Sequence, residues 1–364
     1  MGEYQVKILI VGANASQGMY GQQLLDDSLL SAAAETHVTF YDRKPVALQR
    51  RFTNLVKGAE QKRVVFVDTF PSKQRFDVVI IAVSSEQHVP ALREVLNKLP
   101  ELPRLFVLEK PLGVSVEDLQ WYRSVGDQLQ PLTVVNEPYH FMYSVAELLL
   151  LAKAKPLTEV NVWSSKKRRL ANEHGGLKVF AIEFPHLHGV ASRFADHVLS
   201  LPECCVNEYY RDVQGVPNND GSFARFMFGG VAYTVSQGLG AFVMDRHGTM
   251  QAHDDPPRTR KIRLNYADGS YVELDTEPAF PSHNSRGAGG ELYFYDAHNQ
   301  VERTKTIPDD PRRFFVEFIV RRALEPRTPL LDGVKLLDSL DRNRALIELR
   351  SAAAEVIGRR IPSA

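Results

Sequence analysis

Short apolar runs alternate with longer, mixed stretches along residues 1–137. The runs have the length and residue types of buried strands. They are Lys7–Val11, His37–Tyr41, Val64–Val67, Asp77–Val83, Leu105–Leu108 and Leu132–Val135. Stretches between them, such as Met19–Ala34 and Ser115–Leu129, have the composition of helices. Strands that alternate with helices predict an α/β fold with a doubly wound parallel sheet.

The pattern changes after Pro138. A helical stretch, Phe141–Lys153, precedes a series of strand-like runs separated by turn signals such as Asp268-Gly269. These runs are Thr158–Ser165, Glu203–Asp212, Phe223–Phe228, Val231–Gln237, Lys261–Tyr266, Tyr271–Leu274 and Glu291–Tyr295. Amphipathic helices over Pro311–Ala323 and Gly333–Glu355 are expected to close the chain. We therefore predict a first domain over 1–137 and a second, α+β domain over 138–364.

The turn after the first strand contains glycine and leads into a helix. Such a turn can hold the pyrophosphate of a dinucleotide on the helix N-terminus. The Gly-x-Gly-x-x-Gly pattern is incomplete, because Asn14 and Gln17 stand where glycines are usual. Asparagine tolerates a positive φ, so the turn can still form. The segment fits a plain strand-to-helix turn or a cofactor-binding turn, whose contacts would come from Gly12, Asn14, Ala15, Ser16 and Gln17.

Asp42 follows the second strand, 30 residues after Gly12. The usual interval is about 20 residues, and the long first helix can absorb the difference. An acidic residue here can bind both hydroxyls of the adenosine ribose, which favours NAD. Arg43 beside it could instead bind the 2′-phosphate of NADP. We expect NAD and leave NADP open.

Polar residues also follow the later strands. Ligands of open α/β sheets bind outside the carboxyl ends of the strands. We therefore expect cofactor contacts from these positions, although each charge could equally be an ordinary strand-end charge. The residues are Val83, Ser84 and His88 after the fourth strand, Glu109 and Lys110 after the fifth, and Asn136 after the sixth.

Three segments together resemble the glucose–fructose oxidoreductase, inositol dehydrogenase and MocA family. They are Val11–Gly21, Ala82–His88 and Glu109–Gly113, and Glu109-Lys110-Pro111 is the most specific. The resemblance extends less sharply over the whole chain. It implies a Rossmann domain, a second domain with an open, mostly antiparallel sheet, and NAD(P)-dependent oxidation or reduction of a sugar or polyol. It also implies a homodimer or homotetramer formed through that sheet, and a cis peptide bond before Pro111.

The resemblance also implies a histidine in the second domain that opens a helix facing the nicotinamide. The segment Glu183-x-Pro185-His186 matches that motif. Many members carry an Asp three residues after the histidine, where this chain has Gly189, and His188 is a rival for the same role. Histidine is suited to taking and giving a proton near neutral pH.

We assign His186 as the general acid/base and Lys110 as the cation that holds and polarises the substrate oxygen. Lys110 could also shuttle the proton. Glu109 is expected to orient Lys110 or the nicotinamide carboxamide. Substrate contacts are expected from Tyr139, Glu183 and His188 as well.

Composition excludes several other classes. The 44 basic and 44 acidic residues cancel, so no global charge recruits nucleic acid or an anionic membrane. Cys204 and Cys205 are adjacent and would point to opposite faces of a strand, which disfavours a disulfide or a shared metal. We assign no metal to His253-Asp254-Asp255. With no signal-peptide pattern and no apolar stretch long enough to span a bilayer, we expect a cytoplasmic protein.

Two other functions stay open. One is an epimerase or lyase that oxidises and re-reduces its substrate on a bound NAD. The other is a sensor of sugar or cofactor without catalysis, which the presence of both Lys110 and His186 disfavours.

Overall fold

The computed structural model describes residues 5–12, 35–42, 64–166, 184–211, 217–239, 242–244, 246–247, 250–252, 258–277, 289–330 and 335–359. The chain divides into two compact units. The first is Met1–Asn136 with Arg312–Leu340, and the second is Glu137–Pro311 with Asp341–Ala364. The first unit thus includes a segment that returns from late in the chain, whereas the sequence analysis placed all of 138–364 in the second domain. The expected helix Met19–Ala34 lies outside the described residues.

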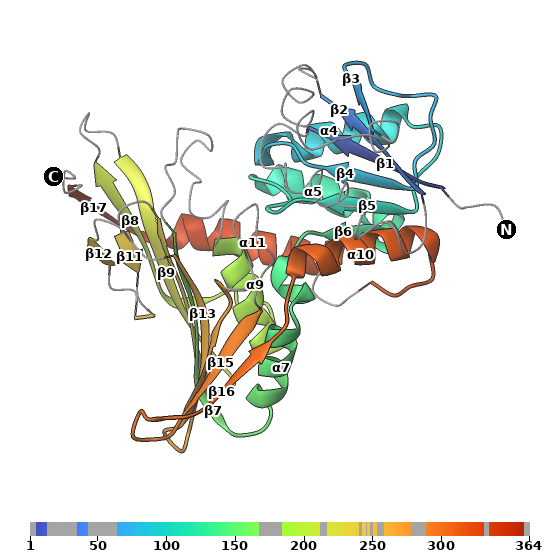
Figure 1. Cartoon of the computed structure of the whole chain (residues 1–364). Helices are drawn as coiled ribbons and strands as arrows, with labels where there is room; N and C mark the ends of the chain where they lie inside the picture. The colour runs from blue at the N-terminus through green and yellow to red at the C-terminus, as the bar shows by residue number, and fades with distance from the viewer. Residues whose placement is uncertain are drawn as a thin grey trace. The chain divides into compact units, whose positions relative to one another are not determined.

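The first unit contains a six-stranded sheet in the order β3-β2-β1-β4-β5-β6 (Figure 1). Every neighbouring pair is parallel, which confirms the predicted doubly wound sheet. The order reverses beside β1, so β1 and β4 form the topological switch point at which such sheets bind ligands. The strands are β1 Gln5–Val11, β2 Glu35–Tyr41, β3 Val64–Val67, β4 Val78–Ile81, β5 Leu105–Leu108 and β6 Thr133–Val135.

Burial on both faces of the sheet explains why the central strands are apolar at every position. Every residue of β4 and β5 is buried, as continuous apolar runs in a parallel sheet require. The helices of this unit are α4 His88–Lys98, α5 Val116–Ser124, α6 Gly126–Leu129 and most of α10 Pro311–Leu324, with short 3₁₀ turns η2 Ser85–Gln87 and η3 Gln130–Leu132.

Helix α5 starts where the sequence predicts. Ser115 and Asp118 form a reciprocal capping box, in which Asp118 N donates to Ser115 Oγ over 3.2 Å and Ser115 N donates to Asp118 Oδ2 over 3.2 Å. The single helix expected over Ser115–Leu129 is interrupted at Val125, whose φ is −109°. Two helices, α5 and α6, replace it.

The second unit contains a nine-stranded sheet in the order β16-β15-β14-β13-β7-β10-β9-β8-β17. It is mostly antiparallel, with parallel pairing of β10 to β7 and of β17 to β8. The strands are β7 Leu157–Lys166, β8 Pro202–Arg211, β9 Pro217–Phe228, β10 Val231–Leu239, β13 Thr259–Tyr266, β14 Tyr271–Asp275, β15 Gly290–Tyr295, β16 Val301–Ile307 and β17 Ala354–Arg359. A separate hairpin joins β11 Phe242–Met244 to β12 Met250–Ala252.

Helices cover one face of this sheet, as Figure 1 shows for α7 and α9. They are α7 Tyr143–Ala152, which follows the 3₁₀ turn η4 Pro138–Phe141, then α9 Phe184–Ala195 and the part of α11 Leu336–Ala352 that starts at Asp341. The core between helices and sheet includes Leu148 of α7, Leu187 of α9 and Val162 of β7, each at most 1% exposed. Within the described ranges, none of the helices combines the length and apolar character that a membrane-spanning helix needs.

Four strands, β11, β12, β16 and β17, were not predicted from the sequence. The last expected helix, Gly333–Glu355, ends at Ala352, and Ala354–Arg359 forms β17 instead. Strand β17 lies parallel to β8, with Ala354 beside Val206, so a distant segment decides its conformation. Strand β16 was not predicted, because all its residues except Ile307 are exposed and give no alternating pattern.

Candidate active site

Gly12, the residue directly after β1, lies at the switch point of the first unit. Gly12 has φ of +76°, which side-chain-bearing residues rarely adopt. Its N–H donates to the carbonyl of Tyr41 over 2.9 Å, and Ala82 N donates to the carbonyl of Val11 over 2.9 Å. A Cβ on Gly12 would overlap Cγ1 of Val83. The carboxyl ends of β1 and β4 therefore meet where a side chain does not fit.

Asp42 directly follows β2, as predicted, and its N–H donates to the carbonyl of Val67 over 3.2 Å. The other residues predicted for this part of the cofactor site, namely Asn14, Ala15, Ser16, Gln17 and Arg43, lie outside the described residues.

His88 supports two loops of the first unit. It is buried at the start of α4, after Ser84 and η2. Its Nδ1 lies 2.7 Å from the carbonyl oxygen of Pro111, and its Nε2 lies 3.1 Å from that of Val83. Burial lowers the pKa of His88, and the two carbonyls partly offset this. We expected His88 to line the cofactor, but both ring nitrogens face backbone, so the residue joins the loop after β4 to the loop after β5.

Glu109 and Lys110 follow β5 and are half-buried. Asn136 Nδ2 donates to Glu109 Oε1 over 2.9 Å, and Asn136 N donates to the carbonyl of Leu108 over 2.9 Å. The ends of β5 and β6 are thus joined through one of the predicted site residues. The Lys110–Pro111 peptide bond is cis, as the resemblance implies.

His186 lies in the first turn of α9, in the second unit. Its Nδ1 donates to Glu137 Oε2 over 3.1 Å, and the two side chains are 12% and 6% exposed. The other carboxylate oxygen, Oε1, lies 3.7 Å from Nη2 of Arg342. Burial alone would raise the pKa of Glu137, but the hydrogen bond and charge of His186, together with Arg342, outweigh it and bring the pKa to about 2. The carboxylate is therefore ionised at neutral pH.

Two residues of η4 lie in the same cluster as His186, Glu137 and Arg342. The buried ring of Tyr139 lies 6.1 Å from that of His186, measured between centroids, so a predicted substrate residue does accompany the predicted acid/base. His140 is also buried, and burial together with Arg342 lowers its pKa to about 3. His140 is therefore neutral at neutral pH.

His188 must be corrected as a candidate. It is fully buried, its Nε2 donates to the carbonyl of Leu199 over 2.6 Å, and its ring lies 5.8 Å from that of Phe226. Burial lowers its pKa to about 4. Residues two apart on a helix point in nearly opposite directions, so the His186 and His188 rings face different sides of α9, although Glu137 and Arg342 also influence the pKa of His188. His188 is a fully buried residue of the core, which disfavours it as the acid/base.

The sequence analysis missed Glu137 and Arg342. Glu137 could have been found, because it directly follows Asn136 at the end of a predicted strand. Arg342 lies within a predicted helix without any motif. Glu183, a further predicted substrate residue, lies outside the described residues. Within the described part of the chain, no group of three or more metal-ligating side chains occurs.

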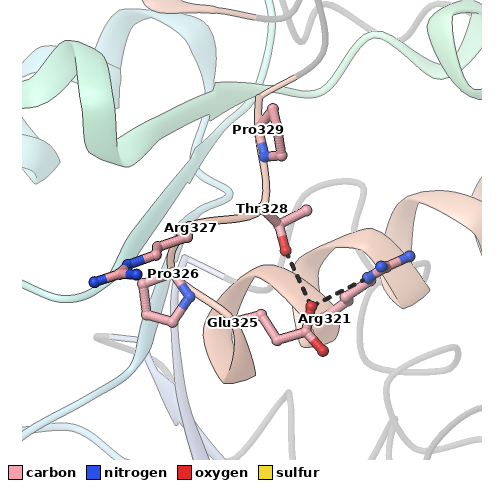
Figure 2. A pocket seen from close by; sticks show the side chains of 6 residues that line it. All are labelled: Arg321, Glu325, Pro326, Arg327, Thr328 and Pro329. Carbon is pink, nitrogen blue, oxygen red and sulfur yellow. Dashed lines mark hydrogen bonds and ion pairs between the residues drawn. The ribbon is translucent and has the colours of Figure 1, made fainter.

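A pocket of about 580 Å³ follows the end of α10 in the first unit (Figure 2). It is lined by Arg321, Glu325, Pro326, Arg327, Thr328 and Pro329. Figure 2 shows Arg321 and Thr328 both directed at the Glu325 carboxylate, over 3.5 Å and 3.4 Å. Arg321 and Glu325 are 70% and 64% exposed, so this is a solvated ion pair. None of the predicted site residues lines this pocket.

No protein-family model matches the sequence, and no curated protein sequence matches it. Solved structures do match. KijD10, a 3-ketoreductase from Actinomadura kijaniata solved with NADP and TDP-benzene, aligns over 97% of this chain and 99% of its own, with a TM-score of 0.69 and 13% identity. The chain shares its fold. UDP-N-acetylglucosamine 3-dehydrogenase GnnA from Acidithiobacillus ferrooxidans aligns over 96% and 98%, with a TM-score of 0.67 and 11% identity. A dehydrogenase from Chromobacterium violaceum aligns over 96% and 95%, with a TM-score of 0.66 and 14% identity.

Proposed function

We propose that this protein is an NAD(P)-dependent oxidoreductase. It transfers a hydride between the nicotinamide and a carbinol or keto carbon of a sugar, cyclitol or sugar derivative. It is a distant member of the glucose–fructose oxidoreductase, inositol dehydrogenase and MocA family. The observation that carries the proposal is the Gly12 turn, which has a positive φ and no room for a Cβ beside Val83. A backbone this closely packed at a switch point is suited to a pyrophosphate.

The residues present fit a dinucleotide. Gly12, Asp42 and Ser84 follow β1, β2 and β4, so all three belong to the carboxyl edge of the sheet. We further assign Asn14 to Gln17 to the pyrophosphate, Asp42 to the adenosine ribose, and Arg43 to the 2′-phosphate if the cofactor is NADP. NAD(P), when bound, supplies the carbon that accepts or donates the hydride. Asp42 favours NAD, while the structural relative KijD10 was solved with NADP, so both cofactors belong in the test.

The chain's own residues position the substrate and move its proton. We assign Lys110 to the substrate oxygen, where its ammonium stabilises developing negative charge. We assign His186 to the hydroxyl proton, which it accepts in oxidation and returns in reduction. Glu109, bonded to Asn136, holds the segment that carries Lys110.

The names of two structural relatives narrow the first substrates to test. GnnA is named for UDP-N-acetylglucosamine, and KijD10 was solved with a TDP-linked compound. We propose that sugars linked to a nucleoside diphosphate come first, followed by free sugars and cyclitols. We further propose a homodimer or homotetramer formed through the nine-stranded sheet, which light scattering would test.

The experiment is a fluorescence titration of the purified protein with NADH and NADPH, followed by a screen of these substrates at the nicotinamide absorbance band. Binding with turnover supports the proposal. Tight binding without any net change in the cofactor would favour an enzyme that recycles bound NAD, or a sensor. Failure to bind either cofactor would contradict the proposal.

A further inference from the structure

We infer that Glu137, the residue before η4, is a positioning residue for His186. It supplies a carboxylate in a place that a side chain at Gly189 of α9 could also reach. The inference deepens the proposed function, on which it rests for calling the proton transfer catalytic. The geometry that carries it lies entirely within the second unit.

Gly189 lies next to the hydrogen-bonded pair of His186 and Glu137. His186 and Gly189 are three residues apart on α9 and so lie on one face of the helix. A Cβ on Gly189 would lie 3.9 Å from Oε2 of Glu137 and 3.6 Å from Nε of Arg342, which are ordinary contact distances. A side chain at position 189 could therefore reach the same place as the Glu137 carboxylate.

The two carboxylate oxygens of Glu137 face side chains of two different helices, α9 and α11. Oε2 accepts from Nδ1 of His186, and Oε1 faces the guanidinium of Arg342 on α11. This arrangement holds the ring of His186 with its proton on Nδ1 and turns Nε2 to the opposite edge, the atom that we assign to the substrate hydroxyl. The negative charge also favours the imidazolium that forms when His186 accepts a proton.

Other titratable or charged groups act on the same cluster. Among the described residues they include His140 of η4, Arg342 of α11, and Arg193 and His188 of α9, each of which interacts electrostatically with Glu137, His140 or Arg342. The Arg342 guanidinium opposes a positive charge on His186, whereas the Glu137 carboxylate, hydrogen-bonded to its ring, favours it.

The experiment follows the histidine ring signals by nitrogen–proton NMR as a function of pH. The His186→Gln variant identifies the His186 signals by their loss. Glu137→Gln keeps the shape and an acceptor but removes the charge. We expect the titration midpoint of His186 to fall by roughly one to two pH units in this variant. Arg342→Met removes a nearby cation and is expected to move the midpoint upward.

Glu273→Gln is the matched control. Glu273 is also buried and paired with two cations, Lys261 at 2.7 Å and Arg263 at 2.9 Å. This variant should leave the His186 midpoint unchanged. In Glu137→Gln/Gly189→Asp, where the carboxylate returns from α9, at least half of the shift should be recovered.

An unchanged midpoint in Glu137→Gln, or an equal fall in Glu273→Gln, would overturn the inference. Failure of the double variant to recover the shift would overturn the equivalence of the two positions. The titration uses neither cofactor nor substrate, so its outcome is separate from that of the proposed function. Once a substrate is known, the pH limb of the rate profile that reports His186 should move to lower pH in Glu137→Gln, without a matching change in KM.

Discussion

Nδ1 of His88 lies 2.7 Å from the carbonyl oxygen of Pro111, 23 residues along the chain. With the second contact to Val83, one buried ring joins the loops that follow β4 and β5. These loops carry Ser84 and Lys110, which we assign to the cofactor and the substrate. The ring is therefore part of the support of the site, although it faces only backbone.

His88→Ala should lower the free energy of unfolding by roughly 2 to 4 kcal/mol, because it leaves a buried carbonyl without a donor and opens a cavity. Affinity for NADH should fall with it. Urea unfolding and fluorescence titration measure the two effects. The exposed His298 offers a control, since His298→Ala should change neither. Equal stability of the two variants would show that the ring does not support the loops.

Gly12→Ala should lower the free energy of unfolding and the affinity for the cofactor, for two separable reasons. Positive φ costs roughly 1 kcal/mol for alanine, and the overlap with Val83 adds roughly 1 to 3 kcal/mol. Gly230 has the similar φ of +78°, and a Cβ there would meet no described residue within 4 Å, so Gly230→Ala carries the backbone cost alone. We expect cofactor affinity to fall at least about tenfold in Gly12→Ala and to be unchanged in Gly230→Ala. Retained affinity in Gly12→Ala would contradict the assigned cofactor site.

Acid should destabilise the fold through buried histidines. Burial lowers the pKa of His188 to about 4 and that of His140 to about 3, while both groups bind a proton near pH 6.5 when unfolded. The unfolded chain therefore takes up more protons as pH falls below about 6.5, and each histidine lowers the free energy of unfolding by roughly 1.4 kcal/mol per pH unit down to its folded pKa.

Glu137 acts in the same direction at lower pH. Its pKa of about 2 lies below the ordinary 4.5, so its contribution is present above pH 4.5 and is lost as pH falls toward 2. Urea unfolding between about pH 7 and about pH 5 isolates the histidines. His188→Gln should make the free energy of unfolding depend less steeply on pH, whereas His298→Gln, at an exposed histidine, should not. A free energy of unfolding independent of pH in this range would refute the assignment of neutral buried rings.

Lys110→Met should reduce kcat by about a hundredfold or more while leaving NADH affinity nearly unchanged, because it removes the charge assigned to the substrate oxygen. Lys98→Met is a control within the same unit, since Lys98 pairs with Glu94 at the surface of α4. Steady-state kinetics and fluorescence titration separate the two effects. Equal rates for the two variants would remove Lys110 from the mechanism.

Much of the first unit follows from local sequence. The runs at β3 and β5 match the observed bounds because both are continuous and apolar, although only β5 is buried along its whole length. The α5 cap is visible as Ser115 with Asp118 three residues later. Glu109 and Lys110 were expected at the site because they follow a strand of a parallel sheet. The cis bond before Pro111 and the separate role of Lys110 came from the family resemblance.

The features of the fold and the site that were not predicted depend on contacts between segments far apart in the sequence. The helix predicted over Gly333–Glu355 included Ala354 and Glu355, whereas pairing with β8 places these two residues in a strand. Glu137 and His186 are 49 residues apart, and Arg342 is farther still, so no local window connects them. The choice between His186 and His188 required burial, which the sequence of α9 does not give because apolar residues flank both.

The most direct measurement of the proposed reaction follows deuterium from C4 of the nicotinamide. The protein is incubated with C4-deuterated NADH or NADPH and a mixture of keto-sugars linked to UDP or TDP, and the recovered sugars are analysed by mass spectrometry. We predict that a sugar gains one deuterium as the cofactor is oxidised, and that this gain disappears in Lys110→Met. Recovery of every sugar without deuterium, together with an unoxidised cofactor that is bound to the protein, would contradict hydride transfer to a sugar as its function.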